Sequence, residues 1–234
     1  RTKDNRDVLI SADIYNKVKT DSLNVGVRII AADGKVVAES RQNVRFNGKW
    51  RQREYSLKPV SIDNARLWSC ESPYLYTAEV TVYDKQGNTV DRVTDQFGVR
   101  TVEFSPKFGL KLNGKKVLLK GWAGHHTMGA VGAAAYPRAE EKMIRTMKEF
   151  GYNHIRTSHN PYSENLMRLC DKHGILVVDE LYDKWNDEKT GGRADFLSLY
   201  QRDIPEFVTR DRNHPSVVMW SLGNELQQYS DMPF

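Results

Sequence analysis

Strand-like and helix-like segments alternate through the second half of the chain, and this alternation limits the possible folds more than any other feature. Short apolar runs rich in β-branched residues predict strands at 116–122, 154–157, 175–180 and 216–221. Apolar residues at helical spacing predict helices at 138–150, from 163 to a stop at Gly174, and around 195–212. Strands that alternate with helices favour a parallel sheet with right-handed crossovers. We therefore predict an α/β domain over residues 104–234.

The first part of the chain, residues 1–103, has a different pattern. Its runs alternate apolar and polar residues, most clearly at 76–83, and Asp33-Gly34 and Gln86-Gly87-Asn88 supply turns between them. About seven short strands in roughly 100 residues are typical of an immunoglobulin-like β-sandwich. This segment shows no catalytic grouping, so we expect a supporting role for it.

Composition excludes several classes of protein. No apolar run approaches the roughly 20 residues that a membrane-spanning helix needs, and no signal peptide is visible near the start. The net charge of +5 is spread over interleaved acids and bases, which argues against nucleic-acid binding. Cys70 and Cys170 lie in different predicted domains, so no disulfide is indicated. The compartment stays open between cytoplasm and periplasm.

Polar residues follow the strands of the second domain at the point where each strand ends. They are Arg156 with His159, Asp179 with Glu180, and Asn224 with Glu225. In a barrel of parallel strands, active-site groups sit at the carboxyl ends of the strands. We therefore expect these side chains to form one constellation on one rim.

Glu225 is the leading candidate for chemistry. Next to Trp220 and Leu222, its carboxyl group is expected to be partly desolvated, which raises the pKa and keeps a general acid protonated near neutral pH. The alternative is a surface glutamate that caps the following segment. Asn224 can donate to and accept from a sugar hydroxyl, or it can simply form the loop.

Arg156 can hold a carboxylate ionised through bidentate contacts, and His159 can donate to a sugar hydroxyl or fix the loop before Pro161. His125 and His126 form a further pair. Adjacent histidines cannot easily aim at one ion, and no third ligand has the spacing of a metal site, so we predict no metal. Asp179 and Glu180 could act as acid and base, although ion pairing within the rim is the commoner role. Three tryptophans could offer flat faces to a sugar ring or belong to the core: Trp122, Trp185 and Trp220.

Several segments, in order, resemble glycoside hydrolase family 2, which holds β-galactosidases, β-glucuronidases and β-mannosidases. The longest runs from Asn213 to Glu225 and resembles the acid/base signature of that family. The others are Leu67–Tyr76, Phe97–Arg100, Leu112–Lys115, Lys120-Gly121, Ile155–Pro161 and Leu169–Gly174. The resemblance covers nearly the whole chain.

The resemblance implies an immunoglobulin-like β-sandwich over residues 1–103, followed by the first half of a TIM (β/α)8 barrel over 104–234. It implies hydrolysis of β-glycosides with retention, in which one carboxyl protonates the leaving oxygen and a second, about 5 Å away, attacks the anomeric carbon. By position, Glu225 resembles the acid/base and Asn224 the contact to the sugar 2-hydroxyl. Arg156 and His159 resemble residues that support the nucleophile and bind substrate, and His126 is a further substrate-binding candidate.

The sequence also departs from the family pattern. The nucleophilic glutamate belongs to a later strand that this chain does not contain, and the N-terminal sugar-binding domain is absent. Thr127 stands where many relatives carry an aspartate. Lys184 and Asn186 occupy the stretch in which some β-galactosidases carry magnesium ligands, so we predict no catalytic magnesium and no other cofactor.

We therefore expect part of a β-galactosidase-like O-glycosyl hydrolase that acts on a β-linked oligo- or polysaccharide. The 234-residue chain by itself is expected to be inactive because the nucleophile is missing. The alternative is a non-catalytic carbohydrate-binding or scaffold module. Unpaired edge strands of a half-barrel favour a homo-oligomer. The sugar stays open between galactose, glucuronate and mannose.

Overall fold

The chain divides into two compact units, each made of two separate segments. In the computed structural model, which describes residues 2–3, 6–15, 20–46, 53–185 and 196–226, the first unit comprises Arg1–Trp68 and Tyr74–Thr101. The second unit comprises Ser69–Pro73 and Val102–Phe234. The boundary predicted after residue 103 thus falls near the change of unit, but a short segment from within the first 103 residues belongs to the second.

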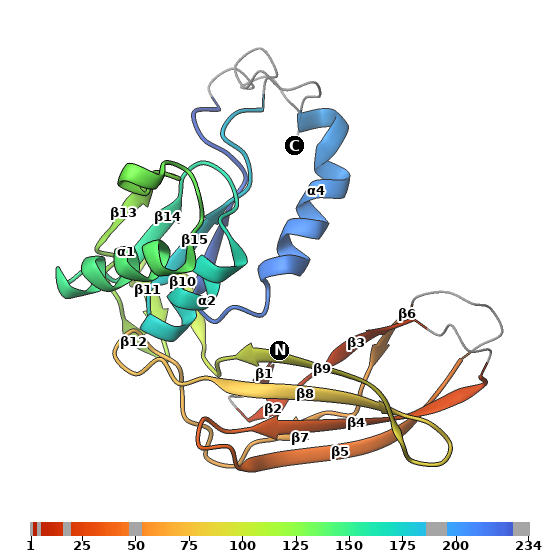
Figure 1. Ribbon diagram of the computed structural model, residues 1–234. Coiled ribbons are helices and arrows are strands. Elements are labelled where there is room, and N and C mark those ends of the chain that lie inside the picture. The colour runs from red at the N-terminus through yellow and green to blue at the C-terminus, as the bar shows by residue number, and fades with distance from the viewer. Residues whose placement is uncertain (1, 4–5, 16–19, 47–52, 186–195, 227–234) are drawn as a thin grey trace. The chain divides into compact units, whose positions relative to one another are not determined.

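The first unit consists of antiparallel strands (Figure 1). These are β1 (Thr2–Lys3), β2 (Asp7–Val8), β3 (Ser11–Ile14), β4 (Ser22–Ile30), β5 (Val36–Arg45), β6 (Arg53–Ser56), β7 (Val60–Ser61), β8 (Tyr76–Tyr83) and β9 (Thr89–Phe97). Four of them form a sheet in the order β5-β4-β8-β9, while β1-β2-β7 and β3-β6 form smaller sheets. The predicted immunoglobulin-like sandwich is confirmed.

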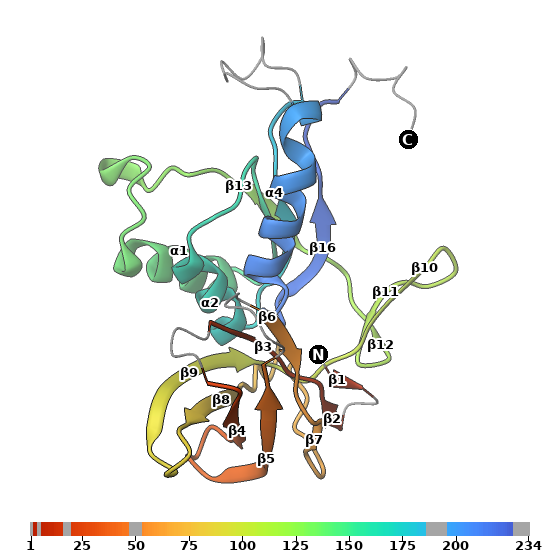
Figure 2. The ribbon, with the colours of Figure 1, turned by 90° about the vertical axis from the view of Figure 1, so that its right-hand side faces the viewer.

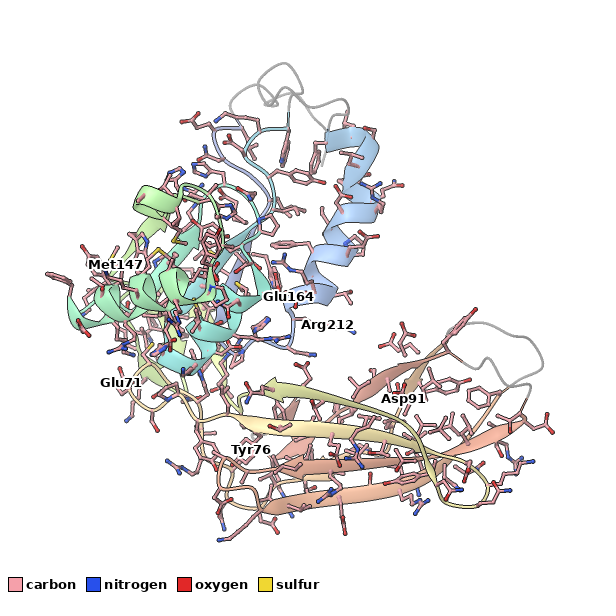
Figure 3. All side chains as sticks on the ribbon, viewed as in Figure 1. Glu71, Tyr76, Asp91, Met147, Glu164 and Arg212 are labelled. Carbon is pink, nitrogen blue, oxygen red and sulfur yellow. The ribbon has the colours of Figure 1, made fainter. Side chains whose placement is uncertain are left out.

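The core of the first unit follows from the alternation of its strands. Val25, Val27 and Ile29 on β4 are buried, and they pack with apolar residues from β2, β5, β7 and β8. Tyr76, labelled in Figure 3, stacks on Phe97 with ring centroids 5.8 Å apart, and its hydroxyl accepts from the backbone N–H of Arg66 at 2.8 Å. A buried tyrosine hydroxyl is thereby satisfied, as burial requires.

The second unit begins with a small antiparallel sheet and continues as a parallel one. The first sheet contains β10 (Val102–Ser105), β11 (Gly109–Leu112) and β12 (Lys115–Lys116). The parallel sheet has the order β13 (Gly121–Gly124), β14 (His154–Thr157), β15 (Leu176–Glu180) and β16 (Val217–Ser221). Its helical segments are η1 (Gly129–Val131), α1 (Pro137–Glu149), α2 (Glu164–His173) and α4 (Phe196–Asp211). In the described residues this sheet is open, as expected for part of a TIM barrel.

Helices cover one face of the parallel sheet. Ile155, Val177 and Val217 point to that face and form a buried cluster with Ile144 of α1 and apolar residues of α2. Helix α4 lies beside β16 (Figure 2), where the Phe207 ring meets the Trp220 ring edge-on at 5.1 Å. The opposite face carries the alternate residues of each strand, and that face includes Arg156 and Glu180.

The prediction of one strand over 116–122 is wrong. Lys116 ends the antiparallel sheet, and the backbone N–H of Val117 still donates to Leu110, so the parallel strand β13 begins only at Gly121. The apolar residues in between connect the two sheets, and the Leu118 side chain is exposed. A continuous apolar run has no alternation of apolar and polar residues, so its sequence does not distinguish a strand from a connecting segment.

The ends of α2 confirm the predicted boundaries. The Ser163 hydroxyl accepts from the backbone N–H of Leu166 at 3.0 Å and caps the first turn. Gly174 ends the helix with a φ of 71°, a left-handed conformation that favours glycine. A Cβ atom at Gly174 would also collide with the carbonyl group of Cys70. Both the backbone angle and the lack of space therefore favour glycine at this position.

The segment Ser69–Pro73 is fixed to the second unit by Lys148 of α1. The Lys148 ammonium donates to the carbonyl oxygens of Cys70 at 2.5 Å and His173 at 2.6 Å. The Lys148 ammonium group thus bonds both the C-terminus of α2 and the Ser69–Pro73 segment. Carbonyl groups at a helix C-terminus lack partners within the helix, and a cation there is favourable.

Part of the long Asn213–Glu225 motif has a structural explanation. Asp171 of α2 accepts from His214 Nδ1 at 2.5 Å and from the backbone N–H of Ser216 at 3.0 Å. These bonds fix the turn that leads from α4 into β16. Asp171 is buried, so its contacts compensate for the loss of water.

A second buried carboxyl group, Asp179, lies on the helix side of β15. It faces Asp211, which pairs with the Arg210 guanidinium, and it accepts from the Thr157 hydroxyl at 3.2 Å. Burial, followed by the neighbouring Asp211 carboxyl, raises the pKa of Asp179 to about 8. In the unfolded chain this pKa returns to about 4.

This raised pKa predicts a pH-dependent stability. Between about pH 4 and 8 the folded chain keeps a proton on Asp179 that the unfolded chain has lost, so the free energy of unfolding falls as pH rises. The slope is at most about 1.4 kcal/mol per pH unit for one proton. We expect urea denaturation at pH 5 and pH 8 to show this fall, and Asp179→Asn to reduce it. Asp63→Asn, at an exposed carboxylate outside this unit, is the control. An unchanged slope in Asp179→Asn contradicts the prediction.

Candidate active site

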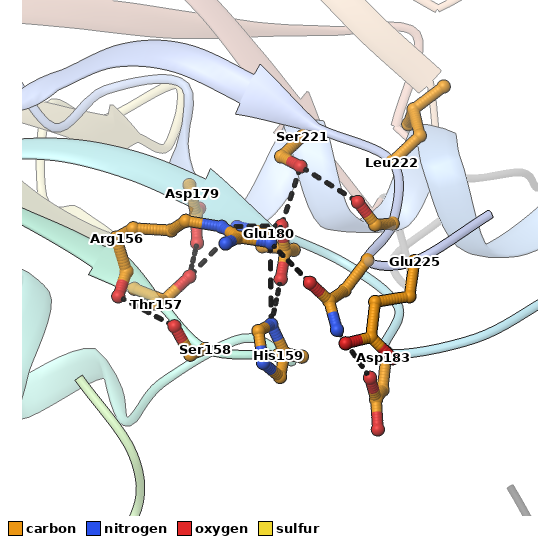
Figure 4. A network of polar contacts seen from close by, with 12 residues as sticks. Arg156, Thr157, Ser158, His159, Asp179, Glu180, Asp183, Ser221, Leu222 and Glu225 are labelled. Carbon is orange, nitrogen blue, oxygen red and sulfur yellow. Dashed lines mark hydrogen bonds and ion pairs between the residues drawn. The ribbon is translucent and has the colours of Figure 1, made fainter. Parts of the chain in front are cut away.

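The carboxyl ends of the parallel strands bring polar side chains together on the face away from the helices. Arg156 pairs in register with Val178, and Glu180 pairs with Ser221. Because side chains alternate along a strand, Arg156, Glu180 and Ser221 point to the same side. Figure 4 shows them converging on the Glu180 carboxylate.

Glu180 is the centre of this network. Its side chain is fully buried, and Oε2 accepts from Arg156 Nε at 2.9 Å, from Arg156 Nη2 at 2.7 Å and from the Ser221 hydroxyl at 2.7 Å. The backbone N–H of Glu180 donates to the Thr157 hydroxyl at 2.8 Å. A buried carboxylate is tolerated when it is paired and hydrogen-bonded in this way.

His159 completes the partners of Glu180. Its Nδ1 atom lies 2.6 Å from Glu180 Oε1 and 3.4 Å from Arg156 Nη2. An ionised carboxylate only accepts, so Nδ1 carries a proton and donates it to Glu180 Oε1. Because the Arg156 guanidinium only donates, its 3.4 Å approach to Nδ1 is then a contact between two donors and not a hydrogen bond. The Ser158–His159 peptide bond is cis. Because Nδ1 is bonded to Glu180, Nε2 is the ring atom that faces away from this carboxylate.

Asn224 is held at both ends of its amide group. Oδ1 accepts from Arg156 Nη2 at 3.0 Å, and Nδ2 donates to Asp183 Oδ1 at 3.2 Å. The backbone N–H of Asn224 also donates to the carbonyl oxygen of Asp183 at 2.9 Å. The orientation of this amide is therefore fixed by the same arginine that pairs with Glu180.

Glu225 differs from the expectation drawn from sequence. Its side chain is 71% exposed, and Oε2 accepts from Lys184 Nζ at 2.5 Å. The hydrogen bond from Lys184 holds the pKa of Glu225 below its ordinary value, whereas desolvation was expected to raise it. Trp220 packs against Phe207 instead of shielding the carboxyl group, so the expected raised pKa is not found in this chain.

Two family descriptions match the chain. "Glycosyl hydrolases family 2, TIM barrel domain" matches residues 107–232, and "Glycosyl hydrolases family 2" matches residues 1–100. The chain belongs to glycoside hydrolase family 2. The fold and the resemblance predicted from sequence are confirmed by these matches.

Individual relatives agree with this assignment. The chain is 39% identical over 203 residues to the β-galactosidase BoGH2A of Bacteroides ovatus. The matched stretch covers 86% of this chain and 24% of that protein. The chain is 32% identical over 213 residues to a β-glucuronidase of Bacteroides fragilis, covering 88% of this chain and 30% of that protein. A family 2 crystal structure from Bacteroides cellulosilyticus DSM 14838 superposes with a TM-score of 0.86 at 35% identity, covering 95% of this chain and 30% of that one. The chain thus spans less than a third of the length of these relatives.

The family 2 structure brings most of the predicted site residues to one rim. Arg156, His159 and Asn224 meet around Glu180, and Glu225 follows Asn224 directly. His126 lies elsewhere: its ring packs on Tyr162 with centroids 4.0 Å apart, and its buried Nε2 has no hydrogen-bond partner in the described residues. Burial lowers the pKa of His126. The ring next to His159 is that of His125, at a centroid distance of 5.2 Å.

The sequence placed Glu180 on the rim together with Asp179, with ion pairing as the commoner role, but it did not single out Glu180 as the centre of the site. The signal that could have found it is the alternation of β15, because Arg156 and Glu180 lie on one face while Asp179 lies on the other. That signal requires the register between the strands, which the sequence does not supply.

The tryptophans have packing roles in this family 2 chain. Trp185 is buried, stacks on Phe196 at 4.2 Å, and donates from Nε1 to the carbonyl oxygen of Leu222 at 2.8 Å. Trp122 meets Tyr152 edge-on at 5.7 Å. The core alternative raised from sequence therefore describes Trp185, whereas the half-buried Trp122 and the exposed Trp220 pack on neighbouring rings.

The described residues contain no group of three or more His, Cys, Asp or Glu side chains placed to hold a metal ion. Asn186, one of the two residues at the predicted position of magnesium ligands, lies outside the described residues. Among the described helices, none has both the length and the apolar character needed to cross a membrane.

Proposed function

We propose that this chain is part of a retaining β-glycoside hydrolase, most similar in activity to β-galactosidases. The observation that carries the proposal is the fixed amide of Asn224, held by Arg156 and Asp183 directly before Glu225 at the carboxyl rim. The names of the relatives support the substrate class, since they include β-galactosidases and β-glucuronidases.

In the proposed reaction, Glu225 is the general acid/base. As an acid it gives its proton to the glycosidic oxygen while a second carboxylate forms a bond to the anomeric carbon. As a base it takes a proton from water, whose oxygen displaces that second carboxylate. We place the second carboxylate in a later strand of the barrel, outside these 234 residues.

The residues around Glu180 are proposed to bind the sugar. Asn224 presents an amide of fixed orientation to a hydroxyl group, and His159 presents Nε2 because its Nδ1 is used by Glu180. Polar groups held in fixed positions stabilise a transition state better than mobile ones. His126 remains a weaker candidate for substrate binding because its ring packs on Tyr162.

A glycoside panel tests the proposal. A protein that carries these residues together with the remainder of a family 2 barrel is expected to release nitrophenol from a nitrophenyl β-galactoside, with β-glucuronide, β-mannoside and α-galactoside as comparisons. Hydrolysis of the α-linked compound alone would contradict the proposal. Sugar binding without any turnover would support the carbohydrate-binding module that the sequence left as an alternative.

The 234-residue chain by itself is expected to hydrolyse none of these compounds, because protonation without a nucleophile leaves the oxocarbenium-like transition state unsupported. Nitrophenol release by the purified chain is the measurement, with Glu225→Gln as the control for contaminating enzyme. Turnover that is lost in Glu225→Gln would show that the chain contains its own nucleophile.

A further inference from the structure

The loops after β15 and β16 are paired beyond the ends of the strands. The backbone N–H of Leu181 donates to Ser221 at 2.9 Å, and that of Asn224 donates to Asp183 at 2.9 Å. Trp185 Nε1 adds a bond to the Leu222 carbonyl oxygen at 2.8 Å. These bonds fix the two loops relative to each other, so the positions of Lys184 and Glu225 are set by the backbone.

Lys184 lies between two carboxylates of these loops. Its Nζ atom is 2.5 Å from Glu225 Oε2 and 3.3 Å from Asp183 Oδ1. Its side chain is only 20% exposed, in contrast to the largely exposed Glu225. Lysine therefore supplies the anchored half of the pair, and Glu225 is the half that reaches into solvent.

The Lys184 contacts continue into the Glu180 network. Asp183 Oδ1 accepts from Lys184 and from Asn224 Nδ2, and Asn224 Oδ1 accepts from Arg156 (Figure 4 labels Arg156, Asp183 and Glu225). One connected chain of polar contacts thus runs from the buried Glu180 to the exposed Glu225. A change at Lys184 is expected to affect Glu225 directly and Asn224 only through Asp183.

We propose that Lys184 is a positioning residue, which holds and orients the Glu225 carboxylate through the hydrogen bond from Nζ to Oε2. The proposal rests on the proposed acid/base role of Glu225. Lys184 does not contact the reacting atoms; it acts through Glu225. The contact favours the carboxylate, which is the form that accepts a proton from water in the second half of the reaction.

The electrostatics of the pair agree with this geometry. The hydrogen bond from Lys184 lowers the pKa of Glu225, and the same bond raises the pKa of Lys184. Both shifts favour the ionised pair. Because Glu225 is exposed, solvent and salt screen the interaction, and the shift should shrink at high ionic strength.

Carbon-13 NMR of the labelled glutamate carboxyl groups tests the proposal on the 234-residue chain. The Glu225 signal is assigned by its loss in Glu225→Gln. We expect Lys184→Met to raise the measured pKa of Glu225, and Lys184→Arg, which keeps the charge, to restore most of the original value. In Glu225→Gln, the pKa of the Lys184 amine should fall.

A matched control separates a specific contact from a general loss of positive charge. Lys172 of α2 donates to Glu141 at 2.8 Å in an exposed pair on the helices. Lys172→Met should raise the pKa of Glu141, whose value is lowered by that lysine, and should leave Glu225 unchanged. The proposal is overturned if Lys184→Met moves the Glu225 titration no more than Lys172→Met does, in a chain whose amide spectrum shows it to be folded.

A second measurement keeps this proposal distinct from the proposed function. In a protein with the remainder of the barrel, Lys184→Met should move the basic limb of the pH profile of kcat/KM to higher pH, because that limb reports the acid/base group. If no glycoside is hydrolysed, the proposed function fails, while the NMR titration still decides whether Lys184 holds Glu225. An unchanged basic limb in an active enzyme counts against the role of Lys184.

Discussion

Glu225→Gln is expected to lower kcat/KM for a β-galactoside with an alkyl leaving group by about 10²- to 10⁴-fold in a barrel-complete protein, the usual range for loss of a general acid. An alkoxide needs a proton as it leaves, and glutamine cannot supply one. A nitrophenyl leaving group is stable as an anion, so its first step should be much less affected. The measurement is steady-state hydrolysis of the two compounds by the variant and the wild type.

Azide distinguishes loss of the acid/base from loss of the nucleophile. With Glu225→Gln, the glycosyl intermediate forms from the nitrophenyl compound but water is no longer activated, and azide attacks without a base. We expect azide to restore turnover and to give a β-glycosyl azide. Equal losses for both leaving groups, with no effect of azide, would assign Glu225 another role.

Arg156→Met is expected to lower the free energy of unfolding of the chain by roughly 3 kcal/mol, the lower part of the range for breaking a buried ion pair. The variant removes two of the hydrogen bonds to Glu180 Oε2 and leaves a fully buried carboxylate with fewer partners. Urea denaturation followed by circular dichroism measures the change.

Two further variants sharpen this result. Adding Glu180→Gln to Arg156→Met removes the uncompensated charge and should recover part of the loss. Arg168→Met breaks an exposed pair with Glu164 in which the nitrogen and oxygen atoms are 3.6 Å apart, and it should change stability by less than about 1 kcal/mol. Equal effects of Arg156→Met and Arg168→Met would contradict the central place given to Glu180.

Local signals were sufficient for the ends of α2. Ser163 and Gly174 act through bonds and backbone angles within a few residues, so the sequence alone places them. The strand predicted over 116–122 failed because its apolar residues leave one sheet before β13 enters another. That division depends on partners distant in the sequence.

The candidate site was predictable in its members but not in its centre. Arg156, His159 and Asn224 were expected at one rim and do meet there. Glu180 was expected at the same rim beside Asp179, but its central position, on the opposite face of β15 from Asp179, emerged only from the register of the strands. The expected desolvation of Glu225 failed for a similar reason. Its partner Lys184 follows a different strand, and only the pairing of the two loops brings the ammonium to the carboxylate.

The insertion of Ser69–Pro73 into the second unit affects how these modules can be recombined. A hybrid gene that exchanges residues 1–103 between relatives also exchanges the five residues whose Cys70 carbonyl meets Lys148 and Gly174. The junction that looks clean in the linear sequence therefore cuts through a folded unit. A hybrid that keeps these contacts has to take Ser69–Pro73 from the same parent as α1 and α2. These five residues therefore belong with the barrel segment in any exchange, although they lie within the sequence of the sandwich.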